Sequence, residues 1–275
     1  MDDTEKPIRN RELFSITVGA IVAVTAASIP VVIMASNFSK SKDTGFEELM
    51  TKHPILIIMA LCCTQLALIL MTAHSAYKSP LSIRESLSIR AINFSPQWWI
   101  LMICTSIGAS SLTSLFIQKN DYMNQFVEIF TSQSLGFGLC VLVLGSVLPG
   151  LSEELLCRGY LQRRLLKRWH PLTAISVSSI FFAALHMDAT HAIAVLPLGL
   201  WLGFLHYHTN SIVPSIVCHM ANNAYAFSIL LYTAKVSPIS DIVTNGTRLI
   251  FLLSLIIGGY TIYNERKQKN QVSSA

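Results

Sequence analysis

The sequence predicts an all-α fold, a polytopic membrane helix bundle with about eight transmembrane helices. Three observations predict it: hydrophobic residues make up 52% of the 275 residues, charged residues make up only 13%, and the mean hydropathy is +0.52. A soluble domain carries ~25% charged residues, so this chain has about half the charge needed to cover a globular surface. The composition therefore excludes a disordered chain, a nucleic-acid-binding module and an ordinary cytosolic enzyme.

Long apolar runs give the individual helices in chain order. A helix of ~20 residues spans the hydrocarbon core of a bilayer, and the runs have about this length, although the fifth and sixth are short. The first run follows basic residues, as a signal peptide does, but at ~23 residues it is too long for one, so we expect an anchor. The runs lie at roughly 13–35, 55–77, 97–118, 135–157, 172–187, 190–207, 211–233 and 247–263.

The distribution of positive charge predicts that both termini face the cytoplasm, because Lys and Arg favour cytoplasmic loops. With the N-terminus inside, most of these residues fall on inner segments: Lys6, Arg9, Arg11, Lys78, Arg84, Arg90, Arg158, Arg163, Arg164, Lys167, Arg168, Arg266, Lys267 and Lys269. The outer loops hold Lys40, Lys42, Lys52, Lys119, Lys235 and Arg248. We expect an integral protein of the plasma membrane whose partner is the lipid bilayer. The net charge of +5 is too small and scattered for a nucleic-acid partner.

A cluster of ionisable residues, E-E-L-L-C-R, lies at the end of the fourth apolar run. Such residues are costly inside a membrane and usually functional. Glu154 and Arg158 are four residues apart, so they share a helix face and can form an ion pair, whereas Glu153 is turned away. Because neighbouring carboxylates repel each other, one can stay ionised beside Arg158 while the other holds a proton, which suits a general acid or base. The alternative is a charge cluster at the membrane rim.

Two further polar clusters are F-A-A-L-H, which ends at His186, and H-M-A-N-N, which begins at His219. Phe182 shares a helix face with His186, and Asn223 shares one with His219, because each pair is four residues apart. A His and an amide aimed into one cavity can both donate hydrogen bonds to a developing oxyanion. The alternative is that they only join helices by hydrogen bonds, as His and Asn commonly do in membranes.

Membrane depth tests whether these clusters can meet. If the fourth helix ended with its apolar run, Glu153 would lie near the cytosolic edge, whereas His186 would lie ~22 Å deep at 1.5 Å per residue. If the helix instead continues through Arg158 to about Arg168, Glu153 is ~16 Å deep. Tilt can account for the remaining difference. We therefore predict a continuous fourth helix, with the Arg-rich segment 163–168 at the cytoplasmic headgroups.

The three clusters, in this order, resemble the CPBP family, also called Abi, of type II CAAX prenyl proteases and bacteriocin-processing or immunity relatives. The family pattern is EExxxR, then FxxxH, then HxxxN, and Gly159–Gln162 also fits the G-x-L-Q that follows EExxxR. The match covers roughly residues 130–235. The resemblance implies an intramembrane endopeptidase whose site opens toward the cytoplasm and whose substrate is a membrane-bound or lipidated peptide, such as a prenylated CAAX protein. Some relatives are immunity or adaptor proteins, so a non-catalytic membrane partner is the alternative.

The resemblance also implies site roles and a domain organisation. Glu153 and His186 would activate the attacking water, and Glu154 would pair with Arg158. The oxyanion would be stabilised by His219 and Asn223. The organisation is then 1–130 for N-terminal transmembrane helices without a recognised motif, 131–235 for the catalytic core, and 236–275 for the last transmembrane helix and cytoplasmic tail.

The sequence leaves the use of a metal ion open. The H-E-x-x-H arrangement of common zinc peptidases does not occur. Glu153, His186 and His219 could bind one Zn²⁺ with a water as the fourth ligand, or paired Glu and His could act without a metal. We favour the metal-free alternative because of the nearby Arg158 and the extra Glu.

The remaining His and Cys residues are expected to be structural. The six cysteines lie in or beside apolar runs without zinc-type spacing, as small apolar side chains do. Asp188 and His191 fall in the turn between the fifth and sixth runs, and His206 lies at a span end. A second metal site from His186, Asp188 and His191 is a weaker alternative.

Overall fold

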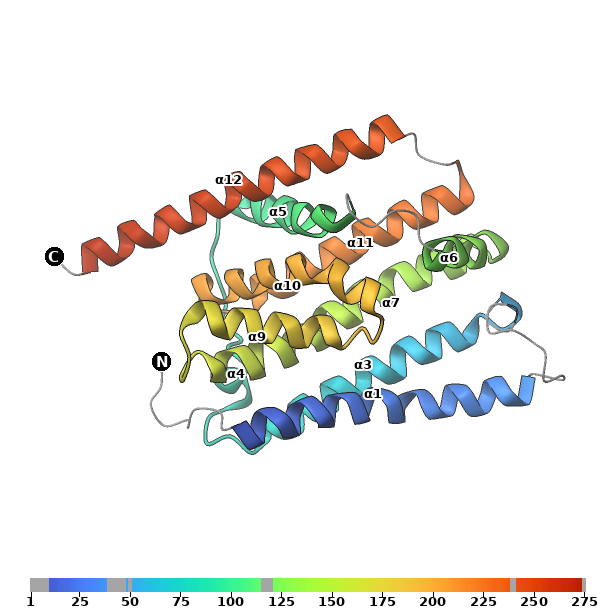
Figure 1. Cartoon of the computed structure of the whole chain (residues 1–275), viewed down its shortest axis with the longest axis horizontal. Helices are drawn as coiled ribbons and strands as arrows, with labels where there is room; N and C mark the ends of the chain where they lie inside the picture. Colours follow the sequence, from blue (N-terminus) through green and yellow to red (C-terminus); the bar gives the residue numbers. More distant parts are fainter. Residues whose placement is uncertain (1–9, 39–47, 49–50, 115–120, 238–240, 274–275) are drawn as a thin grey trace.

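The computed structural model describes residues 10–38, 48, 51–114, 121–237 and 241–273, and helices form most of this part (Figure 1). The all-α prediction is therefore confirmed. The helices discussed below are α1 (Asn10–Phe38), α3 (Ile55–Tyr77), α4 (Ile83–Ser86), α5 (Pro96–Ser114), α6 (Asp121–Ser132), α7 (Leu135–Glu154), the π-helix η1 (Leu155–Gln162), α8 (Arg163–Leu165), α9 (Pro171–Ala184), α10 (Ala189–Thr209), α11 (Val213–Lys235) and α12 (Asp241–Ser273).

Four of the described helical stretches are long and apolar enough to cross a membrane. They are Arg11–Ala35, Ile55–Tyr77, Leu135–Leu165 and Ala189–Thr209. The predicted fifth span corresponds to α9, which is apolar but only 14 residues long. The third, seventh and eighth correspond to α5, α11 and α12. A membrane helix bundle is thus confirmed, while the number of eight spans stays a prediction.

The helices form three layers with the middle of the chain at the centre (Figure 1). On one side α1 packs against α3, which packs against α7 and η1. On the other side α12 packs against α5, which packs against α10 and α11. The central layer joins α7 to α11, α9 to η1, and α9 to α10. Its helices are therefore covered by protein on both sides, which is where polar side chains can be buried at membrane depth.

The fourth predicted helix does continue past Arg158, as α7, η1 and α8 without interruption as far as Leu165. Its middle part differs from the prediction because it is a π-helix, in which hydrogen bonds join residues five apart. A π-helix is rare and often lies at a functional site. Here the widened segment approaches the loop after α4, since a Cβ on Gly159 would lie 2.9 Å from the carbonyl oxygen of Leu87.

The position of the Arg-rich segment at the cytoplasmic headgroups stays a prediction, but its first two side chains are covered by protein. Arg163 and Arg164 are 5% and 7% exposed. Arg163 donates a hydrogen bond to the carbonyl oxygen of Ser86 at 3.4 Å, and Arg164 donates one to the Ser86 hydroxyl at 3.2 Å. The two side chains are buried because α4 covers this end of the bundle, and the apolar run pattern gave no sign of α4.

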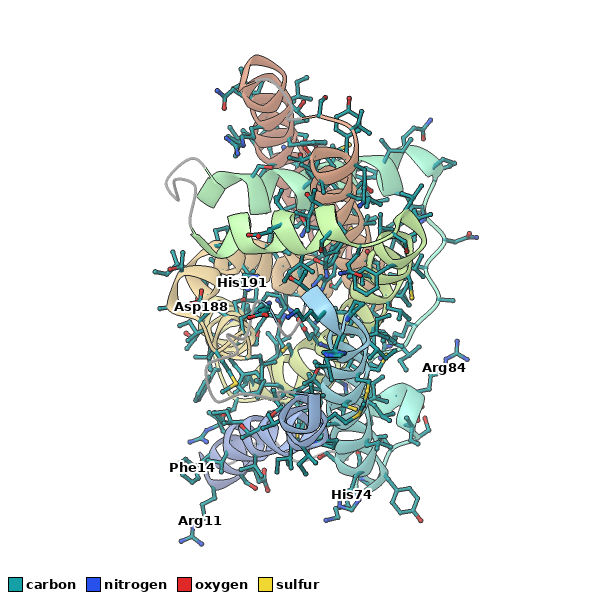
Figure 2. All side chains as sticks on the ribbon, turned by 90° about the vertical axis from the view of Figure 1, so that its right-hand side faces the viewer. Arg11, Phe14, His74, Arg84, Asp188 and His191 are labelled. Atoms are coloured by element: carbon teal, nitrogen blue, oxygen red, sulfur yellow. The ribbon has the colours of Figure 1, made fainter. Side chains whose placement is uncertain are left out.

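Large apolar side chains cover the outside of the bundle. Phe14 is 70% exposed and projects outward from the first turns of α1 (Figure 2), and Leu172 and Ile256 are similarly exposed on α9 and α12. Such a surface is stable against lipid and would not be stable against water. With the apolar helices, it identifies the protein as integral to the membrane.

The orientation in the membrane stays a prediction. Several basic residues on which it rests lie, wholly or in their side chains, outside the described part: Lys6, Arg9, Lys40, Lys42, Lys119, Arg266, Lys267 and Lys269. The start of α1 and the end of α12 do lie toward the same end of the bundle (Figure 1). This arrangement agrees with termini on one side of the membrane, without indicating which side.

Candidate functional site

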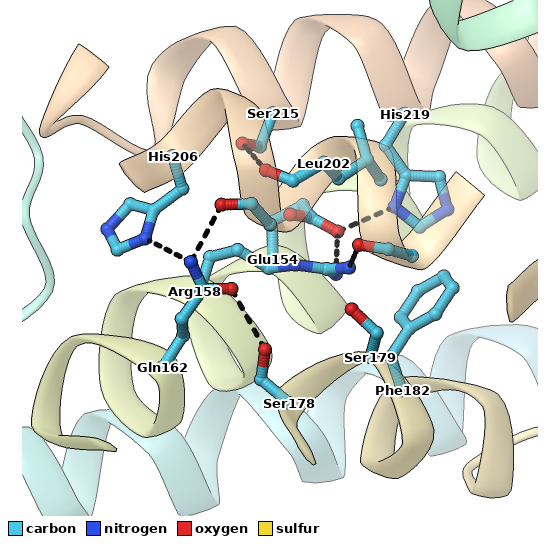
Figure 3. Close-up of polar contacts among 12 residues, drawn as sticks. Glu154, Arg158, Gln162, Ser178, Ser179, Phe182, Leu202, His206, Ser215 and His219 are labelled. Carbon is cyan, nitrogen blue, oxygen red and sulfur yellow. Dashed lines mark hydrogen bonds and ion pairs between the residues drawn. The ribbon is translucent and has the colours of Figure 1, made fainter. Parts of the chain in front are cut away.

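The three sequence clusters meet inside the central layer (Figure 3). Glu154 ends α7, Arg158 lies in η1, Phe182 lies near the end of α9, and His219 lies in α11. Each of these four residues is at most 2% exposed. The continuous helix through Arg158 is what brings the first cluster to the depth of the other two.

Glu154 is the centre of the cluster. Its Oε1 accepts a hydrogen bond from Arg158 Nη1 at 2.6 Å, and both side chains are completely buried. The predicted ion pair is therefore confirmed. The same Oε1 lies 3.1 Å from His219 Nδ1, and Arg158 Nη2 donates to the carbonyl oxygen of Gly199 at 2.7 Å. The group connects α7, η1, α10 and α11, so the guanidinium and carboxylate each have partners that offset the loss of water.

Glu153 is buried next to this group but is not part of its hydrogen bonds. Its side chain is 7% exposed, and its Oε2 has no hydrogen-bond partner among the described residues. The carboxyl group interacts electrostatically with His219 first, and then with Glu154, Arg158 and His191. A buried carboxyl oxygen without a partner is costly, so Glu153 is a group that a water or substrate can bind.

The two histidines are held by their Nδ1 atoms. His186 Nδ1 lies 3.1 Å from the carbonyl oxygen of Phe182, which can only accept, so Nδ1 carries the proton there. His219 Nδ1 faces Glu154 Oε1 in the same way. The Phe182 ring lies edge-on to both, 5.3 Å from the His186 ring and 5.5 Å from the His219 ring. Both imidazoles thus keep Nε2 to accept a hydrogen bond or a proton, and Nε2 donates only once the ring is protonated.

Asn223 is the predicted residue that lies least close to the others. Its Nδ2 donates to the carbonyl oxygen of Gly145 at a long 3.4 Å, and its Oδ1 lies 3.5 Å from Asn222 Nδ2. Among the described residues no hydrogen bond joins it to Glu153, Glu154 or either histidine. The structure places it one helical turn beyond His219, with an amide that is only weakly held.

His191, considered from the sequence only as a ligand of a second metal site, lies beside the proposed site. Its ring lies 4.5 Å from the ring of His186, and it interacts electrostatically with Glu153. Asp188 caps the start of α10 by accepting a hydrogen bond from the His191 backbone N–H at 2.7 Å (Figure 2). The tight reversal between Ala184 and Ala189 folds His191 back onto His186. The only sequence signal was the short distance between the two histidines.

Neither of the metal sites considered from the sequence is formed as a ligand set. Among the residues that the structure describes, no three His, Cys, Asp or Glu side chains are placed to hold a metal ion. This statement covers both Glu153 with His186 and His219, and His186 with Asp188 and His191. The arrangement instead offers one uncommitted carboxyl group, two anchored imidazoles and a fixed positive charge.

Comparison with known proteins adds one match. A family model described as type II CAAX prenyl endopeptidase Rce1-like matches residues 135–225. The matched segment contains Glu153, Glu154, Arg158, His186, His219 and Asn223. No curated protein and no solved structure matches the chain.

Proposed function

We propose, from the match of residues 135–225 to the Rce1-like family of type II CAAX prenyl endopeptidases, how the protein acts. At the family level it is a CAAX-type intramembrane protease embedded in a lipid bilayer. We propose that it hydrolyses a peptide bond of a membrane-associated substrate, with prenylated CAAX-type peptides as the first class to test, and that a water activated by Glu153 and His186 carries out the attack.

The observation that carries this proposal is the different environment of the two adjacent carboxyl groups. Glu154 is occupied by Arg158 and His219, which hold it as a fixed carboxylate. Oε2 of each carboxyl group has no partner among the described residues, but Glu154 is held through its Oε1, whereas Glu153 forms no hydrogen bond there. Two carboxyl groups in unlike environments suit unlike roles, one structural and one in proton transfer. We therefore assign proton transfer to Glu153.

The reaction then proceeds as an ordinary hydrolysis. Glu153, assisted by His186, takes a proton from water while the water oxygen forms a bond to the scissile carbonyl carbon. The resulting oxyanion accepts hydrogen bonds from His219 and Asn223. When the intermediate collapses, the C–N bond breaks and the proton held by Glu153 passes to the leaving nitrogen. Arg158 holds Glu154, and through it His219, in position throughout.

The rest of the chain serves this site. We propose that 131–235 form the catalytic core, while 1–130 and 236–275 embed it in the bilayer. In this arrangement we place both termini in the cytoplasm, and the expected location of the protein is the plasma membrane. The buried site and the lipid-facing exterior favour a substrate that is itself anchored in the membrane, because such a peptide reaches the site by lateral diffusion.

The proposal is tested with the purified protein reconstituted in liposomes. One substrate is a farnesylated peptide that ends in a CAAX sequence, and its matched control is the same peptide with an unmodified cysteine. Mass spectrometry should show cleavage of the prenylated peptide by the native protein and none by Glu153→Gln. Equal cleavage of both peptides would reject prenyl recognition. Binding without cleavage by the native protein would favour the non-catalytic membrane partner.

The same assay tests the metal-free mechanism. Because the described side chains form no ligand set for a metal, we expect full activity after treatment with a chelator. Loss of activity that added Zn²⁺ restores would reject the metal-free mechanism and retain the peptidase. The control is the same chelator already saturated with Zn²⁺, which separates removal of zinc from an effect of the chelator on the liposomes.

A further inference from the structure

A second buried polar network lies beside the first and joins η1 to α9 and α10 (Figure 3). Its centre is Gln162, which is completely buried. Gln162 Nε2 donates to the carbonyl oxygen of Gly203 at 2.8 Å and lies 3.2 Å from His206 Nδ1, and its Oε1 accepts from the Ser178 hydroxyl at 2.9 Å. His206 lies at the end of a span, in the last turn of α10, and its side chain faces η1 and is only 2% exposed.

The partners fix the orientation of the Gln162 amide. The carbonyl oxygen of Gly203 can only accept, so it must face the amide nitrogen, and the hydroxyl of Ser178 then faces the amide oxygen. The second amide hydrogen is directed to His206 Nδ1, which accepts it. Reversing the amide would bring two oxygens together at Gly203. Gln162 therefore has one bonded arrangement, held from three directions by buried groups.

Gln162 and Arg158 contact α10 in the same way, one turn apart. Arg158 donates to the carbonyl oxygen of Gly199, and Gln162 donates to that of Gly203. A Cβ on Gly203 would lie 2.8 Å from Gln162 Oε1, and one on Gly199 would lie 3.0 Å from the Phe182 ring. The two glycines let η1 approach the α10 backbone closely enough for both bonds. The two long side chains thus fix η1 in one register on α10.

This register matters because a π-helix is seldom stable by itself. Its position depends on the side chains that hold it, and Arg158 lies within it. If Gln162 were released, Arg158 would shift relative to Gly199, and Glu154 and His219 would lose the partner that orients them. We propose that Gln162 is a positioning residue of this protein, which holds Arg158, and through it Glu154 and His219, in the reactive arrangement. The inference rests on the proposed peptidase activity.

The first test is Gln162→Met, which keeps the length and approximate volume of the side chain and removes its hydrogen bonds. We expect kcat to fall about 10- to 100-fold, since small misplacements of catalytic groups have effects of this size, while KM stays near its native value because Gln162 does not touch substrate. Trp201→Phe is the matched control. It removes a buried hydrogen bond from α10 to Ser106, 3.0 Å long and away from η1, so it should lower the unfolding midpoint and leave kcat unchanged.

The second test leaves Gln162 intact. Gly203→Ala places a methyl group where the Gln162 amide lies and should displace it, so the same selective loss of kcat is expected. Gly246→Ala is its control, because a Cβ there meets no atom within 4 Å. Native kcat in both Gln162→Met and Gly203→Ala, or a loss no larger than the loss of folded protein, overturns the inference. If Gln162→Met does not fold, Gly203→Ala decides alone. Absence of turnover in the native protein instead rejects the proposed function, and the inference with it.

Discussion

The central and peripheral helices of this protein differ in how much of their apolar surface is buried by other helices. In α1, 11% of the most apolar stretch is buried inside the protein, against 39% in the stretch formed by α7, η1 and α8. Phe14 and Val32 of α1 face outward, while Arg158 of η1 is completely buried. The comparison shows that the two completely buried charged residues, Glu154 and Arg158, lie in the layer that has protein on both sides, where they pair with each other.

Glycines show how closely individual helix pairs approach. A Cβ on Gly19 of α1 would meet its nearest neighbour, Met71, at an ordinary 3.7 Å. A Cβ on Gly150 of α7 would lie 2.4 Å from a side-chain carbon of Met220, and one on Gly108 of α5 would lie 1.9 Å from the carbonyl oxygen of Phe251 in α12. Small residues permit close helix contact in membranes. Close contact is therefore found both between α7 and α11 at the site and between the outer helices α5 and α12, whereas α1 is held less closely.

The largest expected effect concerns Glu153, which is buried in the central layer and which we expect to matter for turnover but not for folding. Glu153→Gln keeps the size of the side chain but cannot take a proton, so turnover should fall ~10²–10⁴-fold. Folding should be unaffected, because an amide is less costly to bury than a charge. Single-turnover cleavage in liposomes and the thermal unfolding midpoint in detergent measure the two. A folded Glu153→Gln that cleaves at the native rate would remove Glu153 from the mechanism.

The next largest effect is on stability. Arg158→Ala leaves the buried Glu154 without its ion-pair partner, which should destabilise the fold by ~3–5 kcal/mol. Reduced folded yield and a lower unfolding midpoint in detergent would show this. Arg168→Ala is the control, because Arg168 is exposed. Native stability of Arg158→Ala would mean that the buried charges do not hold the central layer together.

A smaller effect is expected for Asn223, and it shows whether catalysis by α11 extends from His219 to the next helical turn. Asn223→Ala should slow cleavage ~10²–10³-fold if its weakly held amide donates to the oxyanion. Stability should change little, because no charge is left unpaired. Asn245→Ala removes an exposed amide of α12, serves as the control and should retain the native rate. Equal rates for the native protein and Asn223→Ala would limit oxyanion stabilisation to His219.

The smallest effect on stability is expected at an exposed residue of a peripheral helix, compared with a buried residue of a central one. Leu70 of α3 is 60% exposed and Leu202 of α10 is completely buried. Leu202→Ala should lower the free energy of unfolding by ~2–5 kcal/mol through the cavity that it leaves. Leu70→Ala should change it by less than ~0.5 kcal/mol, as surface substitutions do. Similar losses, measured by unfolding in the same detergent, would show that the periphery is packed as tightly as the centre.

The features that could be predicted from the sequence follow from apolar run length and helical spacing. The continuous helix through Arg158 followed from the depth that Glu153 needs, and the Glu154–Arg158 pair followed from their separation by four residues. Both arguments depend only on helix rise and turn, which are the same in every helix. The roles of Glu153, His186, His219 and Asn223 remain predictions for the experiments above.

Features that depend on contacts distant in sequence could not be predicted. The short helix α4 is not apolar, so the run pattern did not reveal that it covers Arg163 and Arg164. His191 enters the site because the chain reverses between α9 and α10. The π-helix has no pattern of its own, because it is selected by the contacts of Arg158 and Gln162 with the backbone of α10.

The length of α9 has a consequence for the lipids around it. A helix of 14 residues extends only ~21 Å, whereas the hydrocarbon core is ~30 Å thick. The turn after it, which carries His186, Met187 and Asp188, is not helical, and polar backbone of this kind is tolerated only where protein or water surrounds it. Where lipid faces α9, we therefore expect the hydrocarbon layer to be thinner than elsewhere around the bundle, unless protein or water surrounds the turn. For the proposed membrane-bound substrate, a path along α9 would then cross less hydrocarbon than any other approach to the site.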